Sequence, residues 1–379
     1  MSEPLKRHPS SPLLDHCPEG LPASVYYDPD WYERERDRIW ARNWFYAGRV
    51  NDLVPGSLRK VDVAGFNLLL ARAADGDITC FHNTCRHRGA ELCAGERPLK
   101  GRLITCPYHA WSYDLSGRLA STAFATPGPE FEKSAHGLLP VSLKIWNGCI
   151  FVCLADDPPE FKTDPAPQTL DNWPMDLLVT GHVFEKELAC NWKIFWENYN
   201  ECLHCPGIHP ELSDLVPVYR KGLMGANEAE SWTPEDITGA TMRDGSQSWT
   251  MNGMACGPEF VGLSPAERAN GYTFVTLYPT MFVVGHVDYV RIVSLNPLGP
   301  ERTMLKSEWL FLPDTLGHPD FDLANVIDFA TLVLNQDGEA SEMNQRGLKS
   351  PAFKHARLMP QEYEIHNFQK WVMRQMDDV

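Results

Sequence analysis

Long apolar runs are missing from this sequence of 379 residues. The longest runs, such as FNLLLA at 66–71, have the length of a β-strand, whereas a membrane-spanning helix needs about 18 consecutive apolar residues. The first 22 residues also lack the apolar segment that a secretory signal peptide requires. We therefore expect a cytoplasmic protein with no membrane partner.

Positive charge is also scarce, because 34 Lys and Arg face 50 Asp and Glu and leave a net charge of −16. Binding to nucleic acid depends on clustered Lys and Arg, so this balance argues against a nucleic-acid partner. It also disfavours binding to an anionic membrane surface. A cationic substrate or partner fits the charge better.

Paired cysteines are not expected either. The eleven cysteines are odd in number and scattered. The cytosol keeps thiols reduced, so they are expected to be free thiols or metal ligands.

The pattern of short strands and longer helices predicts an α+β protein with three segments. Residues 1–41 are expected to form an extended arm and a helix that packs on the catalytic domain, the helix beginning at Asp28 and reaching Trp44. Residues 42–155 alternate strand-like runs with turns and predict an all-β domain. A Pro-rich linker follows at 156–168.

The remaining segment, 156–379, combines long strand patterns with two helical patterns. The helices are expected at about 191–203 and from about Asp320 to Leu348. This combination predicts an antiparallel sheet with flanking helices.

A first group of metal-binding residues lies in the β domain. Cys85-x-His87 is followed after eighteen residues by Cys106-x-x-His109. Two Cys and two His can hold zinc tetrahedrally, although a zinc ribbon usually has two residues between the ligands of each knuckle. Cys93 lies between the two pairs and is expected to be a packed thiol.

This spacing, with HRG at 87–89 and CPYHAW at 106–111, resembles the Rieske signature. The resemblance implies a [2Fe–2S] cluster in which two thiolates hold one iron and two imidazoles hold the other. The implied ligands are Cys85, His87, Cys106 and His109.

A second group is ENYNECLHCPGIHP at 197–210. Three sites compete for it: a zinc knot, a redox pair of thiols, or an iron site of histidine and carboxylate. His204 and His209 are five apart, and on one continuous helix they would point about 140° apart. Pro206-Gly207 lies between them, so the helix is expected to stop and His209 to fold back beside His204.

The stretch is similar to the mononuclear-iron motif of Rieske non-haem iron oxygenase α subunits. The resemblance implies that His204 and His209 bind Fe(II) together with Asp337, from LNQDGEASEMNQRGL at 334–348. Glu339 and Glu342 are the alternative carboxylates. Glu201 stands where many ring-hydroxylating members carry Asp, and it is implied to bridge the Rieske histidine of one subunit and the iron histidine of its neighbour.

The form ENYxECxHCxxxH resembles bacterial oxygenases that act on quaternary ammonium compounds such as glycine betaine, carnitine and stachydrine. It implies the terminal oxygenase component of an O₂-dependent monooxygenase or dioxygenase, with hydroxylation of an N-methyl group and demethylation. Quaternary ammonium groups bind over aromatic faces. The aromatic candidates are Trp249, Phe260, Tyr272, Phe282 and Tyr289, with Phe274 and Tyr278 in the same region.

The alternatives are hydroxylation of an aromatic ring or aromatic acid, a Rieske electron carrier without a working second site, and a zinc-binding structural protein. The chain shows neither GxGxxG nor a C-x₄-C-x₂-C run. NAD(P)H is therefore expected to act through a separate flavin and iron–sulfur reductase. The resemblance also implies a homotrimer.

Overall fold

The computed structural model describes residues 8–164, 167–233 and 241–377. The chain divides into two compact units. One is Trp40–Phe161, and the other joins Met1–Ile39 to Lys162–Val379. We call them the β unit and the α+β unit and describe each by itself.

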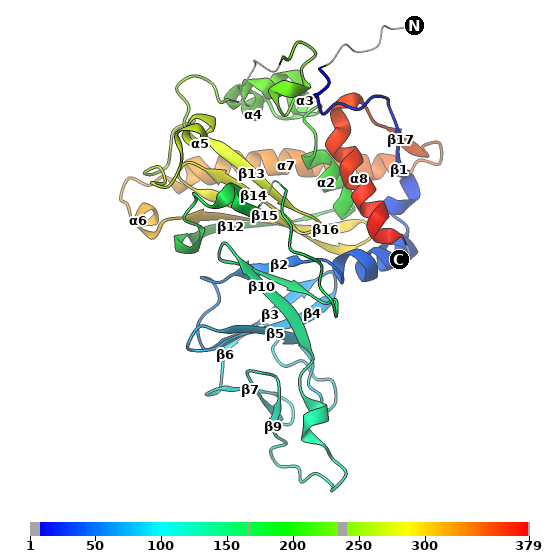
Figure 1. Ribbon diagram of the computed structural model, residues 1–379, viewed down its shortest axis with the longest axis vertical. Helices are drawn as coiled ribbons and strands as arrows, with labels where there is room; N and C mark the ends of the chain where they lie inside the picture. The colour runs from blue at the N-terminus through cyan, green and yellow to red at the C-terminus, as the bar shows by residue number, and fades with distance from the viewer. Residues whose placement is uncertain (1–7, 165–166, 234–240, 378–379) are drawn as a thin grey trace. The chain divides into compact units, whose positions relative to one another are not determined.

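The β unit is built on an antiparallel sheet of seven strands in the order β2-β11-β10-β5-β4-β3-β6 (Figure 1). A small sheet of three strands has the order β7-β8-β9. The strands are β2 (Phe45–Arg49), β3 (Ser57–Val63), β4 (Phe66–Arg72), β5 (Ile78–His82), β6 (Glu96–Pro98), β7 (Leu103–Thr105), β8 (Ser112–Asp114), β9 (Leu119–Ser121), β10 (Pro140–Trp146) and β11 (Cys149–Cys153).

Two tight hairpins explain the register of the larger sheet. Ala64-Gly65 connects β3 to β4 with φ angles of 52° and 78°, and Asn147-Gly148 connects β10 to β11 with 49° and 67°. Two consecutive residues with positive φ make the turn whose twist matches that of the paired strands, and Asn-Gly is the sequence most suited to it. These turns fix the pairing of β3 with β4 and of β10 with β11. The cysteine–histidine loops described below lie in other connections of the β unit.

The α+β unit is built on an antiparallel sheet of five strands in the order β12-β16-β15-β14-β13. The strands are β12 (Val179–Leu188), β13 (Tyr272–Leu277), β14 (Met281–His286), β15 (Val290–Gly299) and β16 (Arg302–Phe311). Two short strands from distant parts of the chain, β1 (Glu19–Pro22) and β17 (His355–Arg357), pair with each other.

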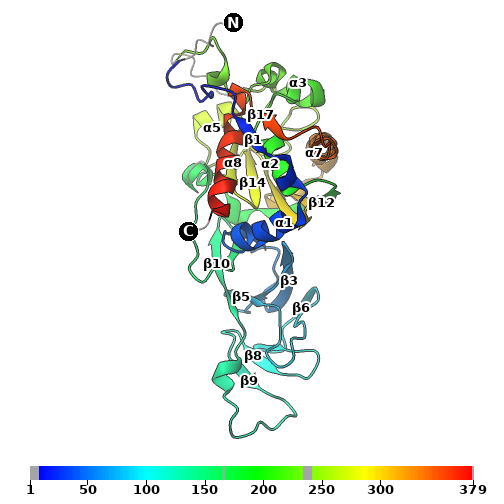
Figure 2. The ribbon, with the colours of Figure 1, turned by 90° about the vertical axis from the view of Figure 1, so that its right-hand side faces the viewer.

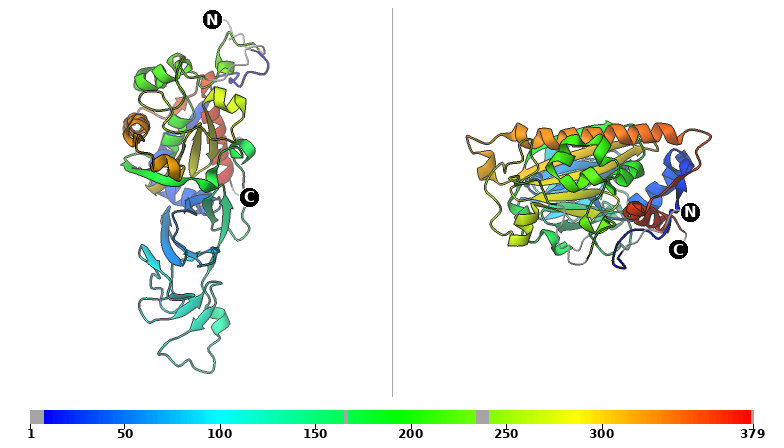
Figure 3. Two further views of the ribbon diagram at one scale, coloured as in Figure 1. Left: turned by 90° about the vertical axis from the view of Figure 1, so that its left-hand side faces the viewer. Right: turned by 90° about the horizontal axis from the view of Figure 1, so that it is seen from above.

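Helices surround this sheet, and the longest of them, α7, runs along it (Figure 3). The terminal helix α8 packs beside β1 (Figure 2). The α-helices are α1 (Pro29–Glu35), α2 (Trp192–Tyr199), α3 (Cys205–Ile208), α4 (Pro210–Leu215), α5 (Pro265–Asn270), α6 (Pro313–Leu316), α7 (Leu323–Leu348) and α8 (Tyr363–Met376). Among the described residues, no helix is both long and apolar enough to cross a membrane.

Several details differ from the sequence prediction. The α-helix after Asp28 ends at Glu35 and passes into a π-helical turn at Arg36–Trp40, so it stops short of Trp44. The pattern also missed α8 and β12. β12 is an edge strand, and most of its residues are only partly buried. Its sequence therefore lacks the apolar run by which a buried strand is recognised. Residues 1–7 of the expected arm and 165–166 of the expected linker lie outside the described part of the chain.

Candidate metal centres and their cavity

Two loops of the β unit have the same backbone geometry. In the first, the N–H of Gly89 donates to the Cys85 carbonyl at 2.9 Å, and in the second the N–H of Ala110 donates to the Cys106 carbonyl at 3.1 Å. Gly89 and Ala110 both have positive φ, at 75° and 58°. Each loop therefore turns back sharply and presents its cysteine and histidine on the same side.

The four side chains of these loops lie together. The Cys85 and Cys106 thiols are buried and interact with each other, whereas His87 is exposed and His109 is partly exposed. The two imidazole rings are 4.8 Å apart between centroids, and the His87 ring stacks on Trp111 at 4.6 Å. The Tyr113 hydroxyl lies 3.2 Å from Cys85 Sγ. Two inner sulfurs and two outer nitrogens are the donor set that fits a Rieske cluster.

Cys93 is buried nearby, and its thiol donates to the Gly95 carbonyl at 3.3 Å. The thiol thus has a backbone acceptor of its own. This agrees with the expectation of a packed thiol.

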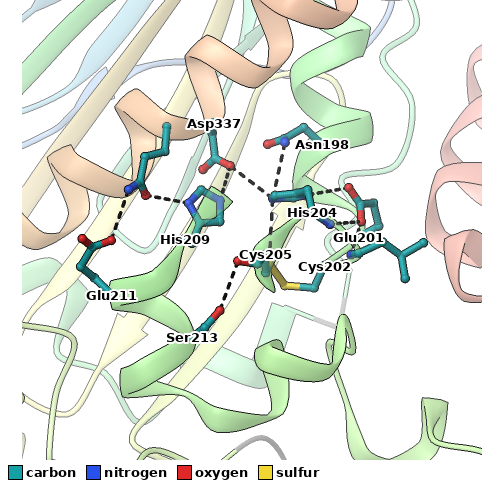
Figure 4. Close-up of polar contacts among 11 residues, drawn as sticks. Asn198, Glu201, Cys202, His204, Cys205, His209, Glu211, Ser213 and Asp337 are labelled. Atoms are coloured by element: carbon teal, nitrogen blue, oxygen red, sulfur yellow. Dashed lines mark hydrogen bonds and ion pairs between the residues drawn. A yellow bond between two sulfur atoms is a disulfide. The ribbon is translucent and has the colours of Figure 1, made fainter. Parts of the chain in front are cut away.

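In the α+β unit, the segment after α2 brings its two histidines together (Figure 4). α2 is capped by Asn191, whose side chain accepts from the Lys193 N–H at 3.0 Å, and it ends at Tyr199. The Glu201 carboxylate then accepts from the backbone N–H groups of Leu203 and His204 and holds the turn that leads into α3.

The prediction that Pro206-Gly207 ends a helix is wrong. Pro206 lies in the first turn of the short helix α3, where its missing N–H costs nothing, and His204 and His209 cap the two ends of that helix. Gly207 is not among the glycines with positive φ. The two rings still come within 5.1 Å between centroids, because each occupies one end of a single helical turn.

Asp337 on α7 completes this group. Its Oδ1 lies 2.8 Å from His209 Nε2 and 3.5 Å from His204 Nε2. The alternatives point elsewhere, since Glu339 is exposed and the Glu342 carboxylate accepts from the Ala189 N–H at 3.0 Å. Two nitrogens and one carboxylate oxygen therefore converge on one point.

The outer nitrogens of both rings already have acceptors. His204 Nδ1 donates to Glu201 Oε1 at 2.5 Å, and His209 Nδ1 donates to Gln336 Oε1 at 2.8 Å. Gln336 in turn donates to Glu211 Oε2 at 3.2 Å. A proton held on Nδ1 leaves the Nε2 lone pair free, which is the tautomer that a metal ligand needs.

The electrostatics of the group favour a cation. Burial lowers the pKa of His204, but its hydrogen bonds to Asp337 and Glu201 outweigh that effect and raise the pKa to about 9. Burial raises the pKa of Asp337, yet the two imidazoles bring it below its ordinary value. The space between the two imidazoles and the Asp337 carboxylate therefore stabilises a positive charge, and a divalent metal ion fits there.

Cys202 and Cys205 form a disulfide, which corrects the expectation that all eleven cysteines are thiols or metal ligands. The turn before α3 brings their Cα atoms within 4.9 Å, inside the range for such a bond. His204, Cys205 and His209 have ligand atoms within 4.8 Å of one another. In the disulfide, however, the sulfur of Cys205 is not a thiolate, and Asp337 supplies the third ligand atom.

A cavity of about 290 Å³ lies against this group. Two of the predicted aromatic residues, Trp249 and Phe282, line it, as do Phe274 and Tyr278. Tyr199 and Tyr219 also line it and were not predicted.

Phe260, Tyr272 and Tyr289, which the sequence also predicts as substrate contacts, are not among the residues that line this cavity. Tyr289 is fully buried behind the wall, where its hydroxyl donates to the Trp249 carbonyl at 2.8 Å. Tyr272 packs against Trp249, with 4.8 Å between ring centroids. Phe260 is buried away from the cavity and exposes 1% of its surface. Aromatic residues of a strand alternate between faces, and the strand pattern does not say which face meets the cavity.

Comparison with known proteins agrees with this picture. Residues 43–132 match the Rieske [2Fe–2S] domain, and residues 174–378 match the catalytic domain of ring-hydroxylating α subunits. The chain belongs to the ring-hydroxylating oxygenase α-subunit family. It is an oxidoreductase, and the resemblance read from the two motifs is confirmed.

Several relatives of this α subunit carry a named activity. The glycine betaine monooxygenase oxygenase subunit of Chromohalobacter salexigens is 30% identical, over 88% of this chain and 80% of that protein. The carnitine monooxygenase oxygenase subunit of Acinetobacter pittii is 27% identical, over 88% and 86%. The fold is that of a solved quaternary ammonium Rieske monooxygenase, with a TM-score of 0.75 at 22% identity over 98% and 100% of the two chains.

Membership of the family implies two cofactors for this α subunit: a Rieske [2Fe–2S] cluster, and a mononuclear iron that uses O₂. Electrons from NAD(P)H reach such a subunit through a separate reductase. The α+β architecture predicted from the sequence is confirmed.

Two polar residues of the iron-site region escaped the sequence analysis. Gln336 directly precedes the predicted ligand Asp337, and its role was hidden because an amide on an exposed helix is common. Asn198 lies within the motif at 197–210, and its side-chain nitrogen is 3.5 Å from His204 Nε2. A third residue, Arg291, lines the cavity and is taken up below.

Proposed function

We propose that this chain is the oxygenase component that hydroxylates, and so demethylates, a small quaternary ammonium compound. The observation that carries the proposal is the aromatic cavity beside the His204, His209 and Asp337 group. A quaternary ammonium has no N–H to donate, so aromatic faces are its best protein partners, at about 0.5–2 kcal/mol each. The named activities of the relatives support the same substrate class.

In this proposal the protein supplies two sets of ligands. Cys85, His87, Cys106 and His109 hold the cluster, while His204, His209 and Asp337 hold the iron. When bound, the iron would supply the activation of O₂. Glu201 and Gln336 hold the two imidazoles in the Nδ1–H tautomer, which keeps both Nε2 atoms directed at Asp337.

The aromatic side chains position the substrate and keep bulk water from it. The ring of Tyr199 stacks on Phe282 at 4.1 Å, and Trp249 and Phe274 lie 6.0 Å apart. All four line the cavity, so an ammonium between them meets aromatic faces on more than one side.

The overall reaction balances with O₂ and NAD(P)H as the named co-reactants. One C–H bond of an N-methyl group becomes C–OH, the second oxygen atom leaves as water, and NAD(P)H gives two electrons through the reductase. The resulting N–CH₂OH group loses a proton from its hydroxyl, the C–N bond breaks with its electron pair on nitrogen, and formaldehyde and a tertiary amine are released.

We further propose that Glu201 links the Rieske histidine His109 of one subunit to the iron histidine His204 of its neighbour in a cytoplasmic homotrimer. The Glu201 carboxylate supports this by its contact with His204 Nδ1 and by its partial exposure. The structure of a relative reported with inter-subunit electron transfer also supports it.

A substrate panel tests the activity. The holoenzyme and a reductase of the flavin and iron–sulfur type are supplied with betaines, aromatic acids and aromatic hydrocarbons, and formaldehyde and hydroxylated products are measured. We expect one formaldehyde to be released for each O₂ consumed, and only when a betaine is the substrate. Hydroxylation of aromatic compounds alone would replace the proposal with ring oxygenation, and a protein with two irons per chain and no turnover would be an electron carrier.

A further inference from the structure

The cavity wall contains a buried cation that has no partner within the described part of the chain. Arg291 on β15 lines the cavity and is only 4% exposed. Its Nε and Nη1 are buried and have no hydrogen-bond partner among the described residues. No carboxylate in that part of the chain forms an ion pair with it, although the charge of Asp337 acts on it. Burying a charged group without a partner is strongly unfavourable, so a partner supplied by a ligand is implied.

The strand register places this guanidinium on the cavity face of the sheet. Arg291 is paired with Val284 of β14, which is paired with Phe274 of β13, and directly paired residues share a face. The neighbouring pair, Thr276 and Phe282, lies two residues along and also lines the cavity. Arg291 thus projects from the same surface that carries the aromatic residues.

Other unpaired donors lie around the same cavity. Trp249 Nε1 and Asn200 Nδ2 are buried and also lack an acceptor among the described residues. The Asn200 side chain is held in place, because its Oδ1 accepts from the Tyr278 hydroxyl at 3.0 Å. These buried donors lack acceptors among the described residues, and a trimethylammonium group offers them none.

We propose that Arg291 binds a carboxylate at the other end of the substrate. This inference rests on the proposed function and narrows it to zwitterionic betaines, as opposed to cationic alcohols such as choline. A planar guanidinium matches a carboxylate with two parallel N–H···O bonds. Only an anion also neutralises the buried positive charge, which a hydroxyl group cannot do.

Ligand binding to the unaltered holoenzyme gives the first test, by calorimetry without reductant so that no turnover occurs. The ligands are trimethylglycine, its methyl ester and choline, which share the trimethylammonium group. We expect trimethylglycine to bind about 100-fold more tightly than the ester or choline, as is typical for one buried charge pair. Equal affinities for the three ligands would overturn the inference.

Variants of Arg291 give the second test. Arg291→Gln keeps hydrogen-bonding capacity but removes the charge, and we expect it to reduce the preference for trimethylglycine to less than about fivefold. Arg291→Lys keeps the positive charge but loses the two parallel N–H donors of the guanidinium. Its preference for trimethylglycine should lie between those of the unaltered protein and Arg291→Gln. Cluster absorbance and three irons per chain serve as the check on folding.

The outcomes separate the two claims. If none of the three ligands binds, the proposed substrate class fails. If all bind equally well, only the carboxylate partner fails. A uniform loss of affinity for all three ligands in Arg291→Gln would mean that Arg291 supports the cavity wall and does not contact the substrate.

Discussion

At the scale of single residues, the two cysteine–histidine loops should have no substitutes for their ligands. We expect His87→Ala and Cys106→Ser to abolish the red-brown chromophore and the Rieske signal in electron paramagnetic resonance, because each removes one of four donors. Cys93→Ser is the matched control, since this thiol is packed against a backbone carbonyl and should leave both signals unchanged. A Rieske signal of normal intensity in either ligand variant would contradict the assignment.

The iron ligands should be separable from the cluster. We expect His204→Ala and His209→Ala to lose the third iron and all turnover while the cluster spectrum persists, because the two groups lie in different units. Iron and sulfide analysis together with the spectrum measure this outcome. Loss of the cluster in a folded variant would show that the two sites are not independent.

Gln336 should have a graded effect on the same site. Gln336→Leu removes the acceptor for His209 Nδ1, and we expect about 10- to 100-fold weaker iron binding without loss of the ring itself. Gln336→Glu retains an acceptor and should recover most of the affinity. Titration of the iron-free protein with Fe(II) distinguishes the two, and equal affinities would argue against this role.

At the scale of elements, a buried ion pair connects α2 to α1. Lys193 Nζ lies 2.5 Å from Glu35 Oε1, and both side chains are fully buried. Glu35 also accepts from the indoles of Trp31 and Trp192. Because α2 leads into the iron-binding segment, this pair secures the element that positions His204.

Lys193→Met should therefore lower the free energy of unfolding by about 3–5 kcal/mol, because it leaves the Glu35 carboxylate buried without its cation. Arg302→Met, which breaks the exposed pair with Glu187, is the matched control and should lower the free energy of unfolding far less, because solvent screens an exposed pair. Denaturant unfolding measures both. Similar losses in the two variants would mean that the buried pair contributes no more to stability than an exposed one.

At the scale of the whole molecule, Glu201 tests the proposed transfer of electrons between subunits. We expect Glu201→Gln to retain cluster and iron, because Glu201 contacts His204 through Nδ1 and not through the metal-facing nitrogen. Electron transfer from the pre-reduced cluster should slow at least about tenfold, since an imidazole pKa shift of one unit corresponds to about 1.4 kcal/mol.

The measurement is single-turnover oxidation of the reduced cluster by O₂ with substrate present. Glu201→Asp keeps the charge and should retain more of the rate than Glu201→Gln. The same experiment on progressively diluted protein tests the oligomer. An unchanged rate in Glu201→Gln, or in a monomer, would count against transfer across a subunit boundary.

The sequence by itself determined what depends on local spacing. The two cysteine–histidine pairs and the two histidines of 204–209 were readable, because neighbouring residues specify a loop or a turn. The family and its two cofactors followed from those motifs, and the α+β fold followed from the pattern of strands and helices. The details of α3 did not, since whether Pro206 ends one helix or starts the next depends on where the preceding helix stops.

Only the tertiary structure decided which distant residues meet. The convergence of Asp337 on the two histidines depends on how α7 lies against α3, and the support of Gln336 for His209 depends on the same contact. Sequence alone did not separate Trp249 and Phe282, at the cavity, from Phe260 and Tyr289, behind it, because burial in a sheet depends on which face its neighbours cover. Arg291 shows the same limit: a lone charge in an apolar strand is visible in the sequence, but its missing partner appears only when every surrounding side chain has its place.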